Sequence, residues 1–228
     1  MGYSFLSGSS IDPFDSVVGP RLTSKSGQAS GIIMAGGDNS RISTNKALLT
    51  LHGRPIIADT LDTLAPIFEE ILIVTNRPQE YTFLNTEAVK DIIPRKGPLG
   101  GLYTGLTVSK NRYNFVVACD MPYLNPDLIL YLLDRSEGFD VVVPQLEAGL
   151  EPLHAVYSKA CLEPILTHLI EGDLKVQSFY GEVRTEYVQQ REIERFDPEL
   201  RAFFNINCRE DLQKVKALAK GGRHIAMG

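Results

Sequence analysis

The sequence predicts a three-layer α/β/α domain built around a mostly parallel β-sheet. Its apolar residues gather in short, β-branched runs, and stretches with helical spacing separate these runs. The runs are continuous rather than alternating, which is typical of strands that helices cover on both faces. Strands that alternate with helices favour right-handed crossovers and therefore parallel neighbours. Ligands of such sheets bind beyond the carboxyl ends of the strands, so the residues after each strand are the first candidates for a site.

The expected strands begin at residue 31. The run 31–35 stops at Gly36 and Gly37, as a buried strand that enters a loop does. Similar runs predict further strands at 70–75, 88–90, 113–119, 139–143 and 203–207. Helices are expected at 56–64, from Gly97 onward, after Asn125-Pro126 and after Asn207. Asn125 as the cap and Pro126 at the first helical position mark one of these helix starts clearly.

Length, composition and charge restrict the class of protein. The chain has 228 residues, of which 43% are hydrophobic and 22% charged, and these values exclude collagen-like, coiled-coil and wholly disordered proteins. The net charge is -5, whereas proteins that coat nucleic acid or anionic membranes carry an excess of basic residues. We therefore expect neither nucleic acid nor a membrane as a partner. No run approaches the roughly 18 to 20 apolar residues of a membrane-spanning helix, and the N-terminal region lacks the layout of a signal peptide.

The cysteine pattern and the N-terminal composition bear on location and domain limits. Cys119, Cys161 and Cys208 lie far apart and form no C-x-x-C pair, which favours a reducing, cytoplasmic location over a disulfide framework or a zinc site. Residues 1–29 show no sustained period of 2 or 3.6. We therefore expect a flexible extension or an added leader at 1–29, one domain at 30–220 and a short tail at 221–228.

The loop after the first expected strand has the composition of a phosphate-binding loop. Two adjacent glycines, Gly36 and Gly37, let backbone amides face outward around an anion. Arg41 and Lys46 add two positive charges to the same loop. The pattern is neither G-x-x-x-x-G-K-[ST] nor G-x-G-x-x-G, which argues against P-loop hydrolases and dinucleotide dehydrogenases. The alternative is an ordinary Gly-Gly turn with solvated basic side chains.

Two carboxylates follow other expected strands. Asp120 comes directly after the strand at 113–119, where it could hold Mg²⁺ together with substrate phosphates. The alternative is an aspartate that only caps the turn before Pro122. Asp91 follows the strand at 88–90 and could reach a ribose or base, although a solvated surface aspartate is the commoner outcome. Both carboxylates are expected at the sheet edge that carries the glycine loop.

Three further segments have both a structural and a functional interpretation. The glycines from Gly97 to Gly105 could admit a flat ring or could pack a helix closely on the sheet. Asn207 with Glu210 resembles a capping box, whereas Asn205 has no such structural reason. The segment 151–157 offers an acid, Glu151, and a histidine, His154. A histidine without a partner at motif spacing is usually structural, so the sequence supports no nucleophilic triad.

Five short motifs, taken from the segments described above, follow one another along the chain. They are Met34-Ala35-Gly36-Gly37 with Arg41, Lys46-Ala47-Leu48-Leu49, Gly97-Pro98-Leu99-Gly100-Gly101-Leu102, Ala118-Cys119-Asp120-Met121-Pro122 and Phe204-Asn205-Ile206-Asn207. Over about residues 31–219 their order resembles that of the molybdenum cofactor guanylyltransferase family, the MobA proteins. The resemblance implies a Rossmann-like nucleotidyltransferase fold for domain 30–220. It also implies GMP transfer from MgGTP to the terminal phosphate of the molybdopterin-type cofactor, giving its guanine dinucleotide form and pyrophosphate.

The same resemblance implies roles for single residues. The GTP-binding residues would be Met34, Ala35, Gly36, Gly37, Lys46, Asp91 and Asp120. Asp120 would also bind Mg²⁺ and would act in catalysis with Arg41 and Lys46, while Asn205 and Asn207 would lie on the pterin side. Arg41-Ile42-Ser43 departs from the family's usual Arg-Met-Gly without changing a charged group. The implied partners are GTP and molybdopterin, with transient contacts to cofactor-biosynthesis proteins and molybdoenzymes.

Two other functions fit parts of the sequence. One is a related nucleotidyltransferase that uses CTP or a sugar or polyol phosphate acceptor, although the Ala35-Gly36-Gly37 start and the paired asparagines favour the guanylyl branch. The other is a catalytically silent, nucleotide-binding regulator. Because phosphoryl transfer asks mainly for positioning and charge neutralisation, the joint presence of Arg41, Lys46 and Asp120 argues against a silent protein.

Overall fold

The computed structural model describes residues 28–36, 46–51, 53–206 and 211, and its centre is a mixed, mostly parallel sheet. The strand order is β10 (Thr185–Gln189), β7 (Val141–Leu146), β9 (His154–Ser158), β6 (Tyr113–Ala118), β1 (Ala29–Met34), β4 (Glu70–Val74) and β5 (Glu87–Val89), and β8 (Gly149–Leu150) pairs with β7 alone. β1 is parallel to both β6 and β4, β4 is parallel to β5, and β7 is parallel to β10. β9 runs antiparallel between β6 and β7.

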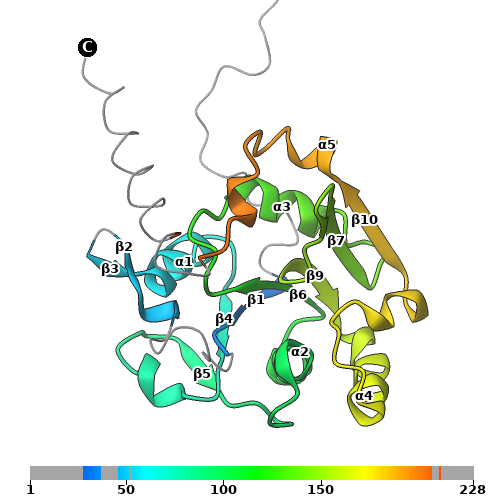
Figure 1. Cartoon of the computed structure of the whole chain (residues 1–228), viewed down its shortest axis with the longest axis horizontal. Coiled ribbons are helices and arrows are strands. Elements are labelled where there is room, and N and C mark those ends of the chain that lie inside the picture. The colour runs from blue at the N-terminus through cyan, green and yellow to red at the C-terminus, as the bar shows by residue number, and fades with distance from the viewer. Residues whose placement is uncertain (1–27, 37–45, 52, 207–210, 212–228) are drawn as a thin grey trace, which may run out of the picture.

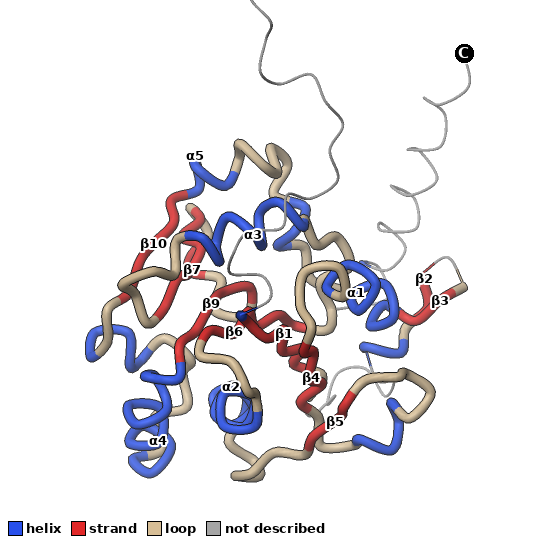
Figure 2. The backbone as a smooth tube through the Cα atoms, turned by 180° about the vertical axis from the view of Figure 1, so that it is seen from behind, coloured by secondary structure: helices blue, strands red, loops and turns tan. Residues whose placement is uncertain are grey.

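The helices cover both faces of this sheet, which confirms the predicted three-layer α/β fold. They are α1 (Ile56–Leu64), α2 (Gly97–Val108), α3 (Pro126–Asp134), α4 (Leu162–Glu171) and the short α5 (Gln190–Ile193). Figures 1 and 2 show α2 and α4 on one side of the sheet and α1 and α3 on the other. A separate small hairpin pairs β2 (Thr50–Leu51) with β3 (Arg54–Pro55). No helix in the described part of the chain is long and apolar enough to cross a membrane.

Neighbouring residues of the central strands enter different cores. Ile33 and Val117 pack in the cluster that contains residues of α1 and α3, whereas Ile32 and Val116 pack in the cluster that contains residues of α2 and α4. Successive side chains of a strand point to opposite faces, so a continuous apolar run fills both cores at once. The continuous runs noted in the sequence therefore correspond to a sheet that is buried on both sides.

The predicted start of α3 is confirmed in atomic detail. The Asn125 side-chain oxygen accepts hydrogen bonds from the backbone amides of Asp127 (2.9 Å) and Leu128 (3.1 Å). Pro126 occupies the first helical position, where its missing N–H leaves no bond unmade. The Asn125 amide also donates to the Phe196 carbonyl at 2.9 Å. One residue thus fixes both the helix start and the chain that returns after α5.

The predicted strand at 203–207 is wrong over its described part. A 3-10 helix spans Arg201–Phe203, and Phe204 to Ile206 form no ladder with another strand. The Phe204 amide instead closes a turn onto the Arg201 carbonyl (3.0 Å). Phe203 is buried in the core that α1 and α3 cover, so its apolar character comes from packing and not from strand pairing. Asn207 and the helix expected after it lie outside the described residues, except for Asp211.

Candidate active site

The carboxyl ends of β1 and β6 lie side by side and form the centre of the candidate site. The Cys119 amide donates to the Met34 carbonyl at 3.1 Å, and the Ala35 amide donates to the Val74 carbonyl at 2.8 Å. These bonds hold the end of β1 between its two neighbours. Met34 and Ala35 are buried, and Gly36 is exposed with nothing within 4 Å of the position a Cβ would take. Gly37 and Arg41, the other predicted loop residues, lie outside the described residues.

The structure brings Lys46 and Asp120 into contact. The Lys46 ammonium lies 3.3 Å from Oδ2 of Asp120, and the two side chains are 24% and 16% exposed. Lys46 begins a 3-10 helix, Lys46–Leu48, whose Ala47 is fully buried in the core. Asp120 is the second residue after β6, one position later than the sequence predicted. A cation and a carboxylate that are partly shielded from water sit where a nucleotide's phosphates would meet the sheet edge.

The donor set at this edge fits magnesium. Mg²⁺ takes oxygen ligands and usually keeps one or two carboxylates together with substrate phosphates. Asp120 supplies one partly exposed carboxylate. Among the described residues no group of three or more His, Cys, Asp or Glu side chains could hold a metal by itself. Phosphate oxygens of a bound substrate could complete the coordination of a metal at Asp120.

Cys119, next to Asp120, is not a reactive thiol. Burial, together with the neighbouring Asp120 charge, raises the pKa of Cys119 to about 12. The thiolate is the nucleophilic form of cysteine, so a thiol with this pKa stays protonated at neutral pH. Cys119 is therefore not a candidate nucleophile.

A second polar pair lies beyond β4 and β5. The Asn76 amide donates to Oδ2 of Asp91 at 3.0 Å. Burial raises the pKa of the Asp91 carboxyl, and the Asn76 hydrogen bond opposes that shift. Asp91 is thus more than a fully solvated surface carboxylate. Sequence reasoning missed Asn76, although its position two residues after β4 follows the same rule that selected Asp91.

The small residues of α2 are explained by packing on the sheet. A Cβ on Gly101 would lie 2.4 Å from the Met34 methyl, and one on Gly105 would lie 2.8 Å from Ile32. Gly97 differs, because its φ of +59° favours glycine and nothing lies within 4 Å of its Cβ position. Close packing therefore accounts for Gly105, whereas the neighbour of Gly101 is the end of the flexible Met34 side chain. Gly97 serves the turn that starts the helix.

The C-terminal segment returns to the same site. The Ile206 amide donates to the Asp120 carbonyl at 2.9 Å. Asn205 directly precedes Ile206 in the sequence. The Asn205 amide donates to the Phe203 carbonyl at 3.2 Å, a local bond that gives it the structural role the sequence did not reveal. The structure thus brings the segment that contains Asn205 to Asp120 through Ile206, and Asn207 lies outside the described residues.

His154 is a core residue. Its ring lies 5.1 Å from the Phe115 ring and 4.9 Å from the Phe203 ring, measured between centroids. Neither ring nitrogen has a hydrogen-bond partner, and burial lowers the pKa of His154 to about 3. The imidazole is therefore neutral at pH 7. This geometry agrees with the structural interpretation of a histidine without a catalytic partner.

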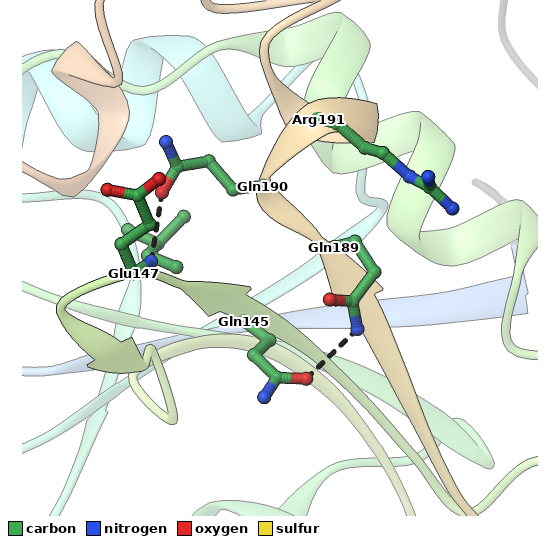
Figure 3. Close-up of a pocket in the computed structure, with 6 residues that line it drawn as sticks. Gln145, Glu147, Gln189, Gln190 and Arg191 are labelled. Carbon is green, nitrogen blue, oxygen red and sulfur yellow. Dashed lines mark hydrogen bonds between the residues drawn. The ribbon is translucent and has the colours of Figure 1, made fainter.

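An open hollow of about 530 Å³ lies beyond the carboxyl ends of β7 and β10 (Figure 3). Amides line it: Gln189 Nε2 donates to Gln145 Oε1 at 2.9 Å, and Gln190 Oε1 accepts from the Glu147 backbone amide at 2.9 Å. Neither Lys46 nor Asp120 contributes to its lining. These bonds join the β7–β8 hairpin to β10 and α5, and they make this end of the sheet a fixed framework.

A family model described as a MobA-like NTP transferase domain matches residues 31–188. The chain belongs to this family. The matched range contains the Lys46–Asp120 contact and the Asn76–Asp91 contact but ends before Asn205. The resemblance found in the short motifs is thereby confirmed.

Two curated relatives extend the likeness of this MobA-like protein over most of the chain. The molybdenum cofactor guanylyltransferase of Desulfosudis oleivorans is 37% identical over 195 residues, which cover 85% of this chain and 96% of that protein. A protein of Peptoclostridium acidaminophilum named probable molybdenum cofactor guanylyltransferase is 35% identical over 198 residues, covering 84% of this chain and 90% of its own.

Solved structures agree on the fold. The molybdopterin-guanine dinucleotide biosynthesis protein A of Archaeoglobus fulgidus gives a TM-score of 0.73 at 23% identity, covering 84% of this chain and 99% of its own. The 4-diphosphocytidyl-2C-methyl-D-erythritol synthase of Anaerococcus prevotii gives a TM-score of 0.63 at 14% identity, covering 86% and 99%. Because the MobA-like chain shares its fold with both, the fold alone does not select the nucleotide.

Proposed function

We propose that this MobA-like protein transfers GMP from GTP to the terminal phosphate of a molybdopterin-type molybdenum cofactor, giving the guanine dinucleotide form and pyrophosphate. The observation that carries the proposal is the Lys46–Asp120 contact at the carboxyl ends of β1 and β6. Phosphoryl transfer asks the protein for positioning and for charge neutralisation, and this pair offers both a cation and a metal ligand. The names of the curated relatives support the choice of nucleotide and acceptor.

The nucleotide is assigned to the part of the edge formed by β1, β4, β5 and α2, which we call the donor half. Met34, Ala35, Gly36 and Gly37 line the phosphates and ribose, and Arg41 adds a charge to their loop. Asp91, held by Asn76, binds the guanosine. Lys46 donates to the triphosphate oxygens, which compete for it with Asp120. The buried end of β1 excludes water behind the phosphates.

The acceptor is assigned to the part formed by β6, β7, β8, β9 and β10, which we call the acceptor half. Asn205 is assigned to this pterin side, as is Asn207, which lies outside the described residues. An acceptor phosphate oxygen attacks the α-phosphorus in line, a new P–O bond forms, and the bond to pyrophosphate breaks. A phosphate is largely ionised near pH 7, so the step requires no strong general base.

Magnesium is the proposed cofactor. Bound at Asp120 and at the substrate phosphates, Mg²⁺ would neutralise charge on the transferring group and on the leaving pyrophosphate. Lys46 contributes the fixed positive charge beside it, and the Asp120 backbone carbonyl is held by the Ile206 amide. This bond anchors the backbone from which the carboxylate extends.

The proposal also covers the domain limits and the setting. We assign the catalytic domain to residues 30–220, with 1–29 and 221–228 outside it. We place the protein in the cytoplasm, where transient contacts with cofactor-biosynthesis proteins and molybdoenzymes would hand the product on. Among the described residues Cys119 and Cys161 are free thiols, which agrees with a reducing location.

The deciding experiment measures GTP-dependent formation of the guanine dinucleotide cofactor by the full chain, with molybdenum cofactor as acceptor and Mg²⁺ present. We expect stoichiometric pyrophosphate release with GTP and little with CTP. Turnover with CTP alone, or with a sugar phosphate in place of the pterin, would assign the protein to the cytidylyl or sugar branch. GTP binding without turnover on any acceptor would support a silent regulator instead.

A further inference from the structure

Glu151 occupies a fixed position at the edge of the acceptor half. It follows β8 directly, and its amide donates to the Pro144 carbonyl of β7 at 3.0 Å. Its own carbonyl accepts the His154 amide at 3.1 Å, at the start of β9. Two residues on, the Leu153 carbonyl accepts the Ala118 amide of β6 at 3.0 Å. Glu151 is thus tied to the carboxyl ends of β7 and β6, and Ala118 is two residues before Asp120.

The hairpin that carries Glu151 is also held from its other side. Figure 3 shows the Gln145–Gln189 bond and the bond from the Glu147 amide to Gln190, which join the hairpin to β10 and α5. In addition, the Tyr157 hydroxyl donates to the Pro152 carbonyl at 2.7 Å. A side chain on such a braced segment is preorganised for binding, because little conformational freedom is left to lose.

The Glu151 carboxylate has no hydrogen-bond or ion-pair partner within the described part of the chain, although it is half-buried. Burial alone raises the pKa of Glu151 above its ordinary value. A partly desolvated carboxylate is stabilised when N–H donors or a cation replace its lost water. Phosphate groups would repel it, so the ligand part that it meets must be a cation or a donor of hydrogen bonds.

The strand order sets the spacing between the carboxyl end of β7, to which the Glu151 backbone is bonded, and that of β6, which precedes Asp120. β7 and β6 are separated by β9 alone, and two strand spacings amount to about 10 Å. That is the length scale of a fused-ring pterin with its exocyclic phosphate. With an acceptor phosphate at Asp120, a ring of this length would span from β6 to the carboxyl end of β7. The far edge of the ring carries a 2-amino group next to a ring N–H, a pair of donors that matches the two oxygens of a carboxylate.

We propose that Glu151 binds the 2-amino-pyrimidinone edge of the pterin acceptor and so positions its phosphate at Asp120. This inference rests on the proposed function, because it names the residue that reads the acceptor of that reaction. Asp91 would meet the like edge or the ribose of the nucleotide at the opposite end of the site. Asp91 would then favour the nucleotide in the donor half, and Glu151 would favour the pterin in the acceptor half.

The first experiment compares the full-length Glu151→Gln variant with Glu147→Gln, an exposed acid on the same hairpin. At saturating GTP we expect Glu151→Gln to raise KM for the molybdenum cofactor about tenfold, the effect of losing a charge-assisted pair. KM for GTP and the Mg²⁺ concentration for half-maximal rate should change less than about twofold, and Glu147→Gln should behave as wild type. A change in the Mg²⁺ concentration for half-maximal rate would indicate that Glu151 is a metal ligand. A raised KM for GTP would indicate that it is a nucleotide ligand. Either result would overturn the proposal.

The second experiment does not depend on turnover. Binding of 6-hydroxymethylpterin and of 6-hydroxymethyllumazine, which lacks the 2-amino group, is followed by quenching of ligand fluorescence in the presence of GTP and Mg²⁺. The wild-type protein should prefer the pterin, and Glu151→Gln should lose that preference while still binding GTP. An equal preference in both proteins would overturn the proposal. Wild-type protein that selects the pterin but makes no product would leave the Glu151 inference standing and refute the proposed reaction.

Discussion

The donor half and the acceptor half of the site are built differently. In the donor half, β1, β4 and β5 are parallel neighbours, and polar residues follow each strand within a few positions. In the acceptor half, the antiparallel β9 separates β6 from β7, and a hairpin and the C-terminal segment supply the edge. In the donor half, short sequence motifs lie in the loops that directly follow parallel strands. The acceptor half is assembled from segments that are far apart along the chain.

This difference explains how one sheet can hold two large ligands. Loops after parallel strands wrap phosphates with backbone amides, so the donor half suits a triphosphate. The acceptor half has a braced hairpin whose Glu151 carboxylate has no partner among the described residues, which suits a ring with N–H donors. Asp120 lies at the junction, two residues after β6, where the two reacting phosphates meet in the proposed reaction. The following predictions test whether the halves act separately.

The largest effect is expected at the junction. Asp120→Asn should lower GMP transfer by about a thousandfold, because it removes the metal ligand's charge from between the two halves. The fold should survive, since Asn keeps the shape of a side chain that is 16% exposed. Steady-state pyrophosphate release at saturating Mg²⁺ measures the loss, and circular dichroism measures the fold. Near-normal transfer by this variant would remove the metal assignment.

Sequence reasoning predicted the donor half better than the acceptor half, for a physical reason. The rule that ligands lie beyond parallel strands brought Lys46 and Asp120 together across 74 residues, and the structure pairs them at 3.3 Å. Asn76 obeys the same rule but stands in no recognisable motif, so it was missed. The acceptor half depends on long-range packing, and apolar residues near Phe203 were read as a strand although they are buried in a turn.

The second prediction concerns packing in the donor half. Gly105→Ala should destabilise the protein by about 1–3 kcal/mol, because its Cβ would lie 2.8 Å from Ile32 Cγ2 and 3.3 Å from Val74 Cγ2. Alanine's helix propensity returns only about 0.5–1 kcal/mol of this loss. Urea unfolding measures the change. The matched control is Gly181→Ala, where nothing lies within 4 Å and the effect should stay within about 0.5 kcal/mol. A Gly105→Ala protein as stable as wild type would mean that the helix can move off the sheet.

A smaller effect is expected for the carboxylate of the donor half. Asp91→Asn should raise KM for GTP about tenfold and leave KM for the molybdenum cofactor unchanged, because Asp91 serves only the nucleotide. Burial raises the pKa of Asp91, so protonation begins at a higher pH than for an exposed aspartate. Wild-type affinity for GTP should therefore fall as the pH drops through that raised pKa, more steeply than the affinity of the variant. Equal rises in both KM values would show that the halves are not independent.

The smallest effect tests the core beneath the acceptor half. His154 is neutral when folded, with a pKa of about 3 set by burial, whereas an unfolded histidine titrates near about 6.5. As the pH falls, the unfolded chain therefore binds a proton at His154 before the folded chain does. The contribution of neutral His154 to stability is present above pH 6.5 and is lost as the pH falls towards 3. Between pH 6.5 and 5.5 the loss should be about 1 kcal/mol. His154→Phe, whose ring can still pack between Phe115 and Phe203, should lack this component. Urea unfolding of both proteins at several pH values measures the difference. If stability changes with pH equally in both proteins, the imidazole reaches water or a proton donor in the folded state. The core beneath the acceptor half would then be less tightly packed than the core beneath the donor half.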